Sequence, residues 1–134
     1  MATRFQLALI WLAMLLGLLA HSVLGIIPLA YQAAAAKTEF AEKLSILLWQ
    51  LTLVFSTHLA LAAMNAFLDT RWLMRVNLVV GALFLVSNVA HPIAHLFESP
   101  IEWHQVALLS LIAALNLQLV LAALRACRTS SSET

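Results

Sequence analysis

The residues best suited to chemistry gather in one short stretch, residues 87–105, which reads SNVAHPIAHLFESPIEWHQ. It holds three of the five histidines and two of the six acidic residues of a chain otherwise rich in leucine and alanine. Imidazole and carboxylate groups bind metal ions and exchange protons near neutral pH. We therefore expect the functional site to lie in or beside this stretch.

The histidine spacing in this stretch is typical of a metal site. His91 and His95 are four residues apart, which places both imidazoles on one helix face and lets them share an ion. Glu98 or Glu102, with His21 from a separate helix, could complete a mixed shell for zinc, copper or iron. The alternative is that only His91 is buried and that His95 and His104 are ordinary residues of the headgroup region.

His21 and His91 are also candidate haem ligands. At about 1.5 Å per helical residue, both lie roughly 10 Å below the outer membrane surface. Histidines from two helices could bind a haem b iron from both faces, or one could bind it and leave the sixth position open. Asn88 would be an alternative or supporting ligand, and His58 a deeper one. The alternative is that His21 simply hydrogen-bonds Asn88 or Ser87 across the core.

Composition indicates an integral membrane protein, because 63% of the 134 residues are hydrophobic and only 10% are charged. The lipid bilayer is therefore the first expected partner. A formal net charge of +1 provides no basic surface for nucleic acid. A single cysteine, Cys127, excludes a disulfide framework and a cysteine-based metal centre.

Four apolar segments reach the roughly 20 residues that a helix needs to cross a bilayer. Short connections make successive helices antiparallel, so we predict an all-α, up-down four-helix transmembrane bundle. It forms one domain over residues 1–127, followed by a disordered polar tail, residues 128–134. Residues 32–39 either extend the first helix or form a short surface helix. The predicted spans are residues 5–31, 42–68, 72–96 and 101–124.

Each predicted helix carries a line of polar or small residues on one face. Polar side chains are costly in lipid, so these faces should point into the bundle. We therefore predict a polar funnel open at the outer surface, with its floor near His58 and Asn116. In chain order the four faces carry Gly17, His21, Pro28 and Gln32; Gln50, Thr57, His58 and Asn65; Asn77, Gly81, Phe84, Asn88, His91 and His95; and Glu102, Gln105, Leu109, Ile112 and Asn116.

The basic residues indicate how the chain crosses the membrane, because cytoplasmic helix ends carry an excess of lysine and arginine. All the arginines fall at one set of helix ends, whereas Lys37 and Lys43 at the other set are offset by glutamates. Both termini are therefore predicted to be cytoplasmic, in a bacterial inner membrane. The arginines are Arg4, Arg71, Arg75, Arg125 and Arg128.

This layout, with Asn88 inside a Ser-Asn-Val tripeptide on the third predicted helix, resembles the small membrane isomerases and mutases typified by styrene oxide isomerase and hydroxylaminobenzene mutase. The resemblance implies a ferric haem b that acts as a Lewis acid on a small lipophilic substrate, in an oligomer. That family places its haem-binding histidine near the start of the second helix, where this chain reads Glu-Lys-Leu at residues 42–44. The resemblance therefore transfers no ligand residue.

Three hypotheses for function follow. The first is a membrane protein that binds haem b or a metal ion in its outer half, with His21 and His91 as main ligands, for electron transfer or for rearrangement of a small lipophilic substrate. The second is a non-catalytic subunit or assembly factor of a larger membrane complex, whose polar faces contact neighbouring helices. The third is a small transporter for a lipophilic or cationic ligand. We also expect a homo-oligomer, since small residues on the second helix allow close approach.

Overall fold

Four α-helices form almost all of the structure, a computed structural model that describes residues 3–33, 39–97 and 99–129. These residues contain no β-strand, so the all-α prediction is confirmed. Every helix contains a segment that is long and apolar enough to cross a membrane. The helices are α1 (Thr3–Ala33), α2 (Glu39–Phe67), α3 (Arg71–His95) and α4 (Trp103–Thr129).

The helix ends differ from the predicted ones by one to five residues, and two of these differences bear on the predicted linker and tail. α1 continues to Ala33, so the start of the predicted linker extends the first helix, and residues 34–38 lie outside the described residues. α4 continues to Thr129, two residues into the predicted tail, because no glycine or proline interrupts the chain after its apolar segment. Residues 130–134 also lie outside the described residues.

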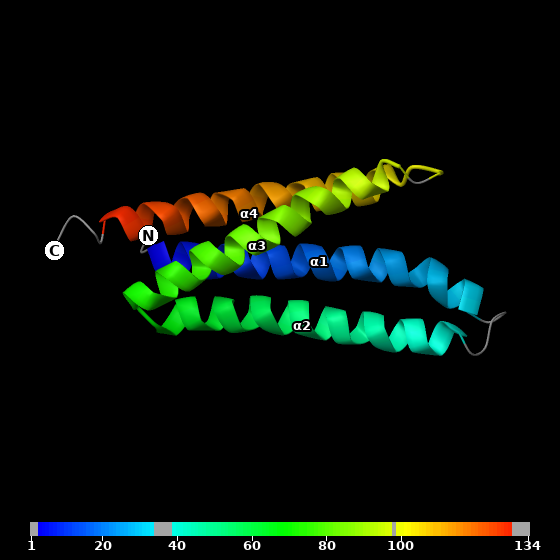
Figure 1. Cartoon of the computed structure of the whole chain (residues 1–134), viewed down its shortest axis with the longest axis horizontal. Helices are drawn as coiled ribbons and strands as arrows, with labels where there is room; N and C mark the ends of the chain where they lie inside the picture. Colours follow the sequence, from blue (N-terminus) through cyan, green and yellow to red (C-terminus); the bar gives the residue numbers. More distant parts are fainter. Residues whose placement is uncertain (1–2, 34–38, 98, 130–134) are drawn as a thin grey trace.

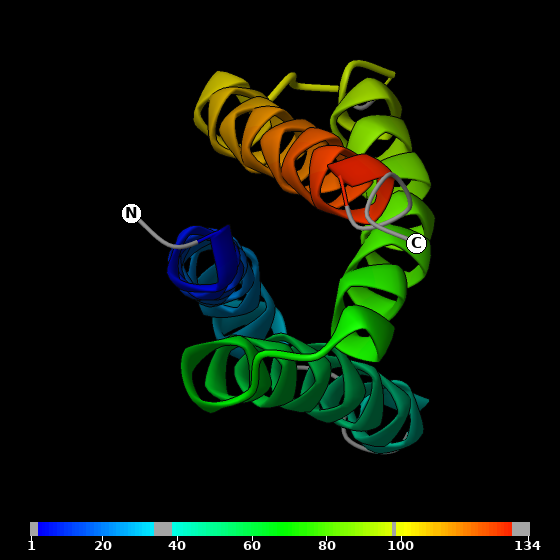
Figure 2. The same cartoon turned by 90° about the vertical axis from the view of Figure 1, so that its left-hand side faces the viewer.

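The helices run alternately in opposite directions, as the short connections require (Figure 1). α1 packs against both α2 and α4, and α3 packs along α4. α3 starts beside the end of α2 and then crosses toward the start of α4, so α2 and α3 have little contact beyond their connection (Figures 1 and 2). The bundle is thus closed at one end and splayed between α2 and α3 at the other.

Burial follows this arrangement. We call the end that holds the start of α1 and the end of α4 the closed half, residues 3–14, 58–81 and 116–129; the other described residues form the open half. Among the described side chains, no residue of α1 after Met14 and none of α2 before His58 is fully buried. The apolar core therefore lies mainly in the closed half. It comprises Leu7, Ala8, Ile10, Trp11, Met14, Leu61, Ala62, Leu73, Leu119, Ala122 and Ala123, with Leu109 and Ile112 in the open half.

Buried asparagines join the helices within this core. Trp11 Nε1 donates to Asn77 Oδ1 at 2.7 Å, and Asn65 and Asn77 exchange two amide hydrogen bonds of 2.9 Å. Asn88 Nδ2 donates to Asn116 Oδ1 at 2.8 Å, linking α3 to α4. The polar faces of these helices therefore point inward, as their spacing predicts. Each amide has a hydrogen-bond partner on another helix, which offsets the free-energy cost of burying it.

Gly81 allows α3 and α4 to approach closely. A Cβ at this position would lie 2.6 Å from Leu119 Cδ2 and 3.3 Å from Val120 Cγ2, both on α4. Asn116 Nδ2 can therefore reach the Gly81 carbonyl at 2.9 Å. This contact fixes α3 on α4 and so sets the path by which α3 carries its histidines to the open half.

Candidate functional site

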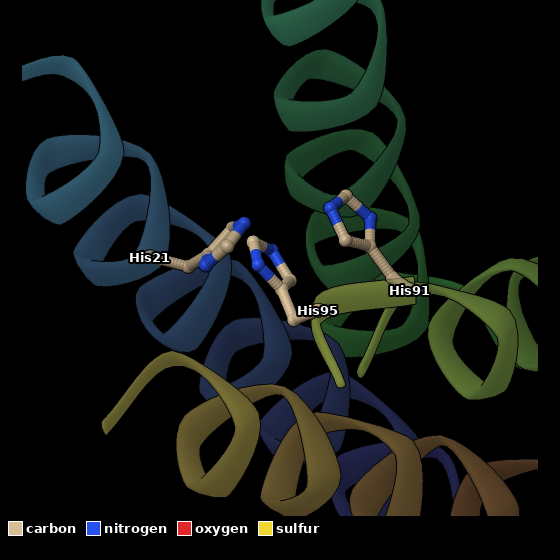
Figure 3. A group of neighbouring side chains, drawn as sticks. All are labelled: His21, His91 and His95. Atoms are coloured by element: carbon tan, nitrogen blue, oxygen red, sulfur yellow. The ribbon is translucent and has the colours of Figure 1, made fainter. Parts of the chain in front are cut away.

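Three histidines meet between α1 and α3 in the open half (Figure 3). His21 comes from α1, and His91 and His95 come from successive turns of α3. Each offers one ring nitrogen such that the three atoms lie within 4.8 Å of one another. The ring centroid of His21 lies 5.2 Å from that of His91 and 5.7 Å from that of His95, both edge-on. His91 and His95 stack at 5.4 Å.

The geometry is close to that of a three-histidine metal site. Three nitrogens bound to tetrahedral zinc at about 2.0–2.1 Å are about 3.3 Å apart, so small ring rotations would close the observed spacing. His91 is exposed and His21 and His95 are half-buried, so none of the three rings is fully enclosed by the protein. Three protein ligands leave a fourth position for water or substrate, as in catalytic rather than structural zinc sites.

Gln105 of α4 orients the first of these ligands. Its side chain is almost fully buried, and its Oε1 lies within hydrogen-bond distance of His21 Nδ1. Because a carbonyl oxygen can only accept, Nδ1 must carry the proton, which leaves Nε2 with the free lone pair. A hydrogen bond of this kind fixes the tautomer and ring orientation of metal-binding histidines. This contact leaves Nε2 as the nitrogen through which His21 could bind a metal.

A pocket of about 540 Å³ adjoins the cluster, between α1, α2 and the part of α3 that leans away from α2. His21 and His91 form part of its wall. Pockets of this size and largely apolar character are typical of small-ligand sites. The remaining wall is contributed by Leu18, Ser22, Gly25, Ile26, Leu47, Gln50, Leu51, Leu53, Val54, Phe55, Phe84, Ser87 and Asn88.

The structure brings together three of the predicted ligands and separates the others. His21, His91 and His95 form the cluster, although His91 is exposed and not buried as the alternative reading required. Glu102 is not part of the cluster, and Glu98 lies outside the described residues. The expected mixed histidine and carboxylate shell is therefore, among the described residues, a shell of histidines alone.

His58 is placed apart from the cluster, in the closed half. It is fully buried and its ring packs edge-on against Trp11 at 5.0 Å and against Phe84 at 4.6 Å. Nδ1 donates to the Val54 carbonyl at 2.8 Å. Neither His58 nor Asn116 lines the pocket, whereas Val54 and Phe84, which both contact His58, do line it. The polar funnel is thus shallower than predicted, because Phe84 separates the pocket from His58.

The hydrogen bond from His21 to Asn88, which is one form of the alternative to ligand binding, is not present in the described part of the chain, because both residues have other partners. His21 pairs with Gln105, and Asn88 pairs with Asn116. The sequence places Gln105 on the inward face of its helix but gives no sign of its partner. That partner depends on how far α4 rotates against α1, which only the packed structure defines.

Comparison of the chain with protein-family models, with curated proteins and with solved structures finds no match. The positions of the histidines and the pocket are therefore the observations that bear on function.

Proposed function

We propose that the protein is an integral membrane protein that binds one transition-metal ion through His21, His91 and His95. The remaining coordination position of the ion would face the adjoining pocket, where a small lipophilic ligand binds. The observation that carries this proposal is the convergence of three ring nitrogens, from two helices, within 4.8 Å. His91 and His95 lie on one face of α3 because they are four residues apart. His21 lies on α1 and meets them only because of the tertiary packing.

Membrane insertion is supported by the surface of the bundle as well as by helix length. Large apolar side chains cover the outside of every helix, where lipid would surround them. The start of α1, the connection between α2 and α3, and the end of α4 lie at the same end (Figure 1), and that end carries the arginines. By the positive-inside rule both termini would be cytoplasmic, and the histidine cluster would lie in the outer half of the bilayer.

The chemistry of the site favours a ligand that is mostly apolar with one polar group. Three neutral imidazoles leave the full charge on a divalent zinc, copper or iron ion, which would polarise a ligand oxygen as a Lewis acid. The apolar walls of the pocket would hold the rest of the ligand. Such a site could rearrange a small lipophilic substrate, or, with copper or iron, transfer electrons.

Metal titration tests the proposal. The protein, purified in mild detergent and stripped with a chelator, should bind one Zn²⁺, Cu²⁺ or Fe²⁺ ion per chain. Replacing His21, His91 or His95 with alanine should weaken binding by more than the 10–100-fold typical of supporting residues. His104→Ala is the matched control, because His104 is exposed and outside the cluster. Failure to bind any ion stoichiometrically would contradict the proposal.

The metal affinity should also depend on pH. A protonated imidazole has no free lone pair, so protons compete with the metal for all three ligands. Affinity is therefore expected to fall as the solution is made more acidic. Equilibrium dialysis at a series of pH values would measure it, and a flat profile would indicate that histidine does not bind the ion.

Haem b is a second candidate for the same region, because the pocket adjoins His21 and His91 and has room for a large planar group. A pyridine haemochrome assay and a Soret band would identify it. The role of His95 separates the two proposals. A haem held by His21 and His91 should survive His95→Ala, whereas an ion held by three histidines should not.

A further inference from the structure

We propose a second binding site at the opposite end of the bundle, for the headgroup of a phospholipid of the phosphatidylethanolamine class. A pocket of about 270 Å³ opens there between the start of α1, the connection between α2 and α3, and the end of α4. It is lined by Thr3, Arg4, Asp69, Thr70, Arg71, Met74 and Ala126. None of these residues belongs to the histidine cluster or to its pocket.

The two arginines supply the charge for a phosphate group. Arg4 and Arg71 come from separate helices and face one pocket. Arg4 lies against the Phe5 ring, 4.8 Å from its centroid, and its buried Nε has no hydrogen-bond partner within the described residues. A buried donor on a charged group is costly to leave unpaired, so a ligand acceptor would stabilise it.

The start of α3 adds to the attraction for an anion. Thr70 caps this helix by accepting a hydrogen bond from the Leu73 amide, and the positive end of the helix dipole points toward the pocket. Backbone amides at a helix start are common phosphate donors. Together with Arg4 and Arg71, they surround the pocket with positive potential from two directions.

Asp69 decides which kind of phosphate fits. Within the described residues it forms no ion pair with Arg4 or Arg71, although all three line the pocket. A free carboxylate would repel a doubly charged phosphate monoester. Two guanidinium groups and one carboxylate instead complement a phosphodiester that carries an ammonium group nearby. Phosphatidylethanolamine has this charge pattern, whereas phosphatidylglycerol lacks the ammonium.

The location suits a lipid rather than a soluble phosphate compound. The pocket lies at the ends of helices long enough to span a bilayer, which is the level at which lipid phosphates lie. It is also the end that carries the arginines, where basic side chains attract headgroups. A lipid bound here would connect α1, α3 and α4 at the end where the core is most tightly packed.

Native mass spectrometry of the full chain in mild detergent, with added phosphatidylethanolamine or phosphatidylglycerol, tests this site. The wild type should retain one phosphatidylethanolamine in preference to phosphatidylglycerol. Arg4→Gln and Arg71→Gln should each weaken binding about fivefold, the effect of one basic side chain at a membrane surface. Arg75→Gln is the matched control, because it removes the same charge one helical turn further along α3 and outside the pocket. Arg4→Lys should retain more binding than Arg4→Gln.

Three results would overturn the proposal. Equal losses for Arg4→Gln, Arg71→Gln and Arg75→Gln would mean that lipid responds only to general surface charge. Displacement of the lipid by excess inorganic phosphate would identify a soluble phosphate site instead. Asp69→Asn should erase the preference for phosphatidylethanolamine, and an unchanged preference would refute the part assigned to Asp69. The free energy of unfolding of each variant, measured in mixed micelles, ensures that the compared proteins are folded.

Discussion

The two halves of the bundle have similar sequences of leucine, alanine and scattered polar residues, yet they pack differently. In the closed half, Trp11, Asn65 and Asn77 form a complete hydrogen-bonded network inside an apolar core. In the open half, α3 leans away from α2, and the space beside His21 and His91 is a pocket. The interior of the closed half holds the helices together, whereas the interior of the open half leaves polar groups accessible to a ligand.

The comparison shows what distinguishes a structural polar residue from a site residue in such a bundle. In the closed half each buried asparagine side chain forms a hydrogen bond to another helix, and these bonds fix how the helices pack. In the open half His21 is held by Gln105 through one nitrogen, which leaves the other for a ligand. α1 and α3 both run from the packed core to the histidine cluster. The packing of the closed half therefore helps to hold the three histidines in position in the open half.

The largest effect is expected from overpacking the closed half. Gly81→Val should lower the free energy of unfolding by about 2–3 kcal/mol, because the new side chain meets the fully buried Leu119. Gly25→Val in the open half should change it by no more than about 0.5 kcal/mol, since no atom lies within 4 Å of a Cβ placed there. Unfolding in mixed micelles measures both.

The same pair of variants tests the function of each half. Gly25 lines the larger pocket, so Gly25→Val should reduce its volume and weaken lipophilic ligands without destabilising the fold. Equal losses of stability at Gly81 and Gly25 would contradict the distinction between the halves.

The next largest effect concerns metal affinity. Gln105→Leu should weaken metal binding about 10–100-fold, because His21 would lose the acceptor that fixes its tautomer. Gln105→Glu should retain most of the affinity, since a carboxylate also accepts from Nδ1. Gln118→Leu is the matched control, because Gln118 is an exposed residue of the same helix. Isothermal titration of the stripped protein measures the change, and equal affinity for Gln105→Leu and wild type would remove Gln105 from the site.

Much of the fold follows from the sequence, whereas only part of the site does. The four spans are predicted by the length of the apolar segments. The inward face of each helix is predicted by the periodicity of its polar residues, such as Asn65 on α2, Asn77 on α3 and Asn116 on α4. The pairing of His91 with His95 follows from helical periodicity alone. The meeting of His21 with them does not, because it depends on how α1 and α3 are placed relative to one another by their packing on α4. His58 shows the limit clearly, since the sequence places it on an inward face but cannot reveal that Phe84 separates it from the pocket.

A smaller loss of stability is expected from breaking the closed-half network. Asn77→Leu removes the acceptor of Trp11 and both bonds to Asn65, and should cost about 1–2 kcal/mol at roughly 0.6 kcal/mol per bond in a membrane protein. Asn88→Leu should cost less than about 1 kcal/mol, because Asn116 keeps its bond to the Gly81 carbonyl. A larger loss of stability for Asn88→Leu than for Asn77→Leu would contradict the conclusion that the hydrogen bonds of the closed half contribute most to stability.

The smallest effect, of opposite sign, is expected at His58. Its Nε2 is buried and has no hydrogen-bond partner within the described residues, although its Nδ1 is bonded to Val54. His58→Phe removes this unpaired acceptor and keeps edge-on contacts with Trp11 and Phe84. The variant should therefore gain up to about 1 kcal/mol of unfolding free energy, since an unsatisfied buried polar group costs about that much.

The sign of the stability change in His58→Phe shows whether His58 Nε2 has a partner. If His58→Phe instead loses about 1 kcal/mol or more, then Nε2 has a partner that the chain itself does not provide, such as a buried water. The core of the closed half would then contain a polar cavity beside His58, and the interiors of the two halves would no longer differ in this respect. His58→Asn serves as the control, because it removes the ring contacts while keeping a polar group. A loss confined to His58→Asn would confirm that His58 contributes through packing.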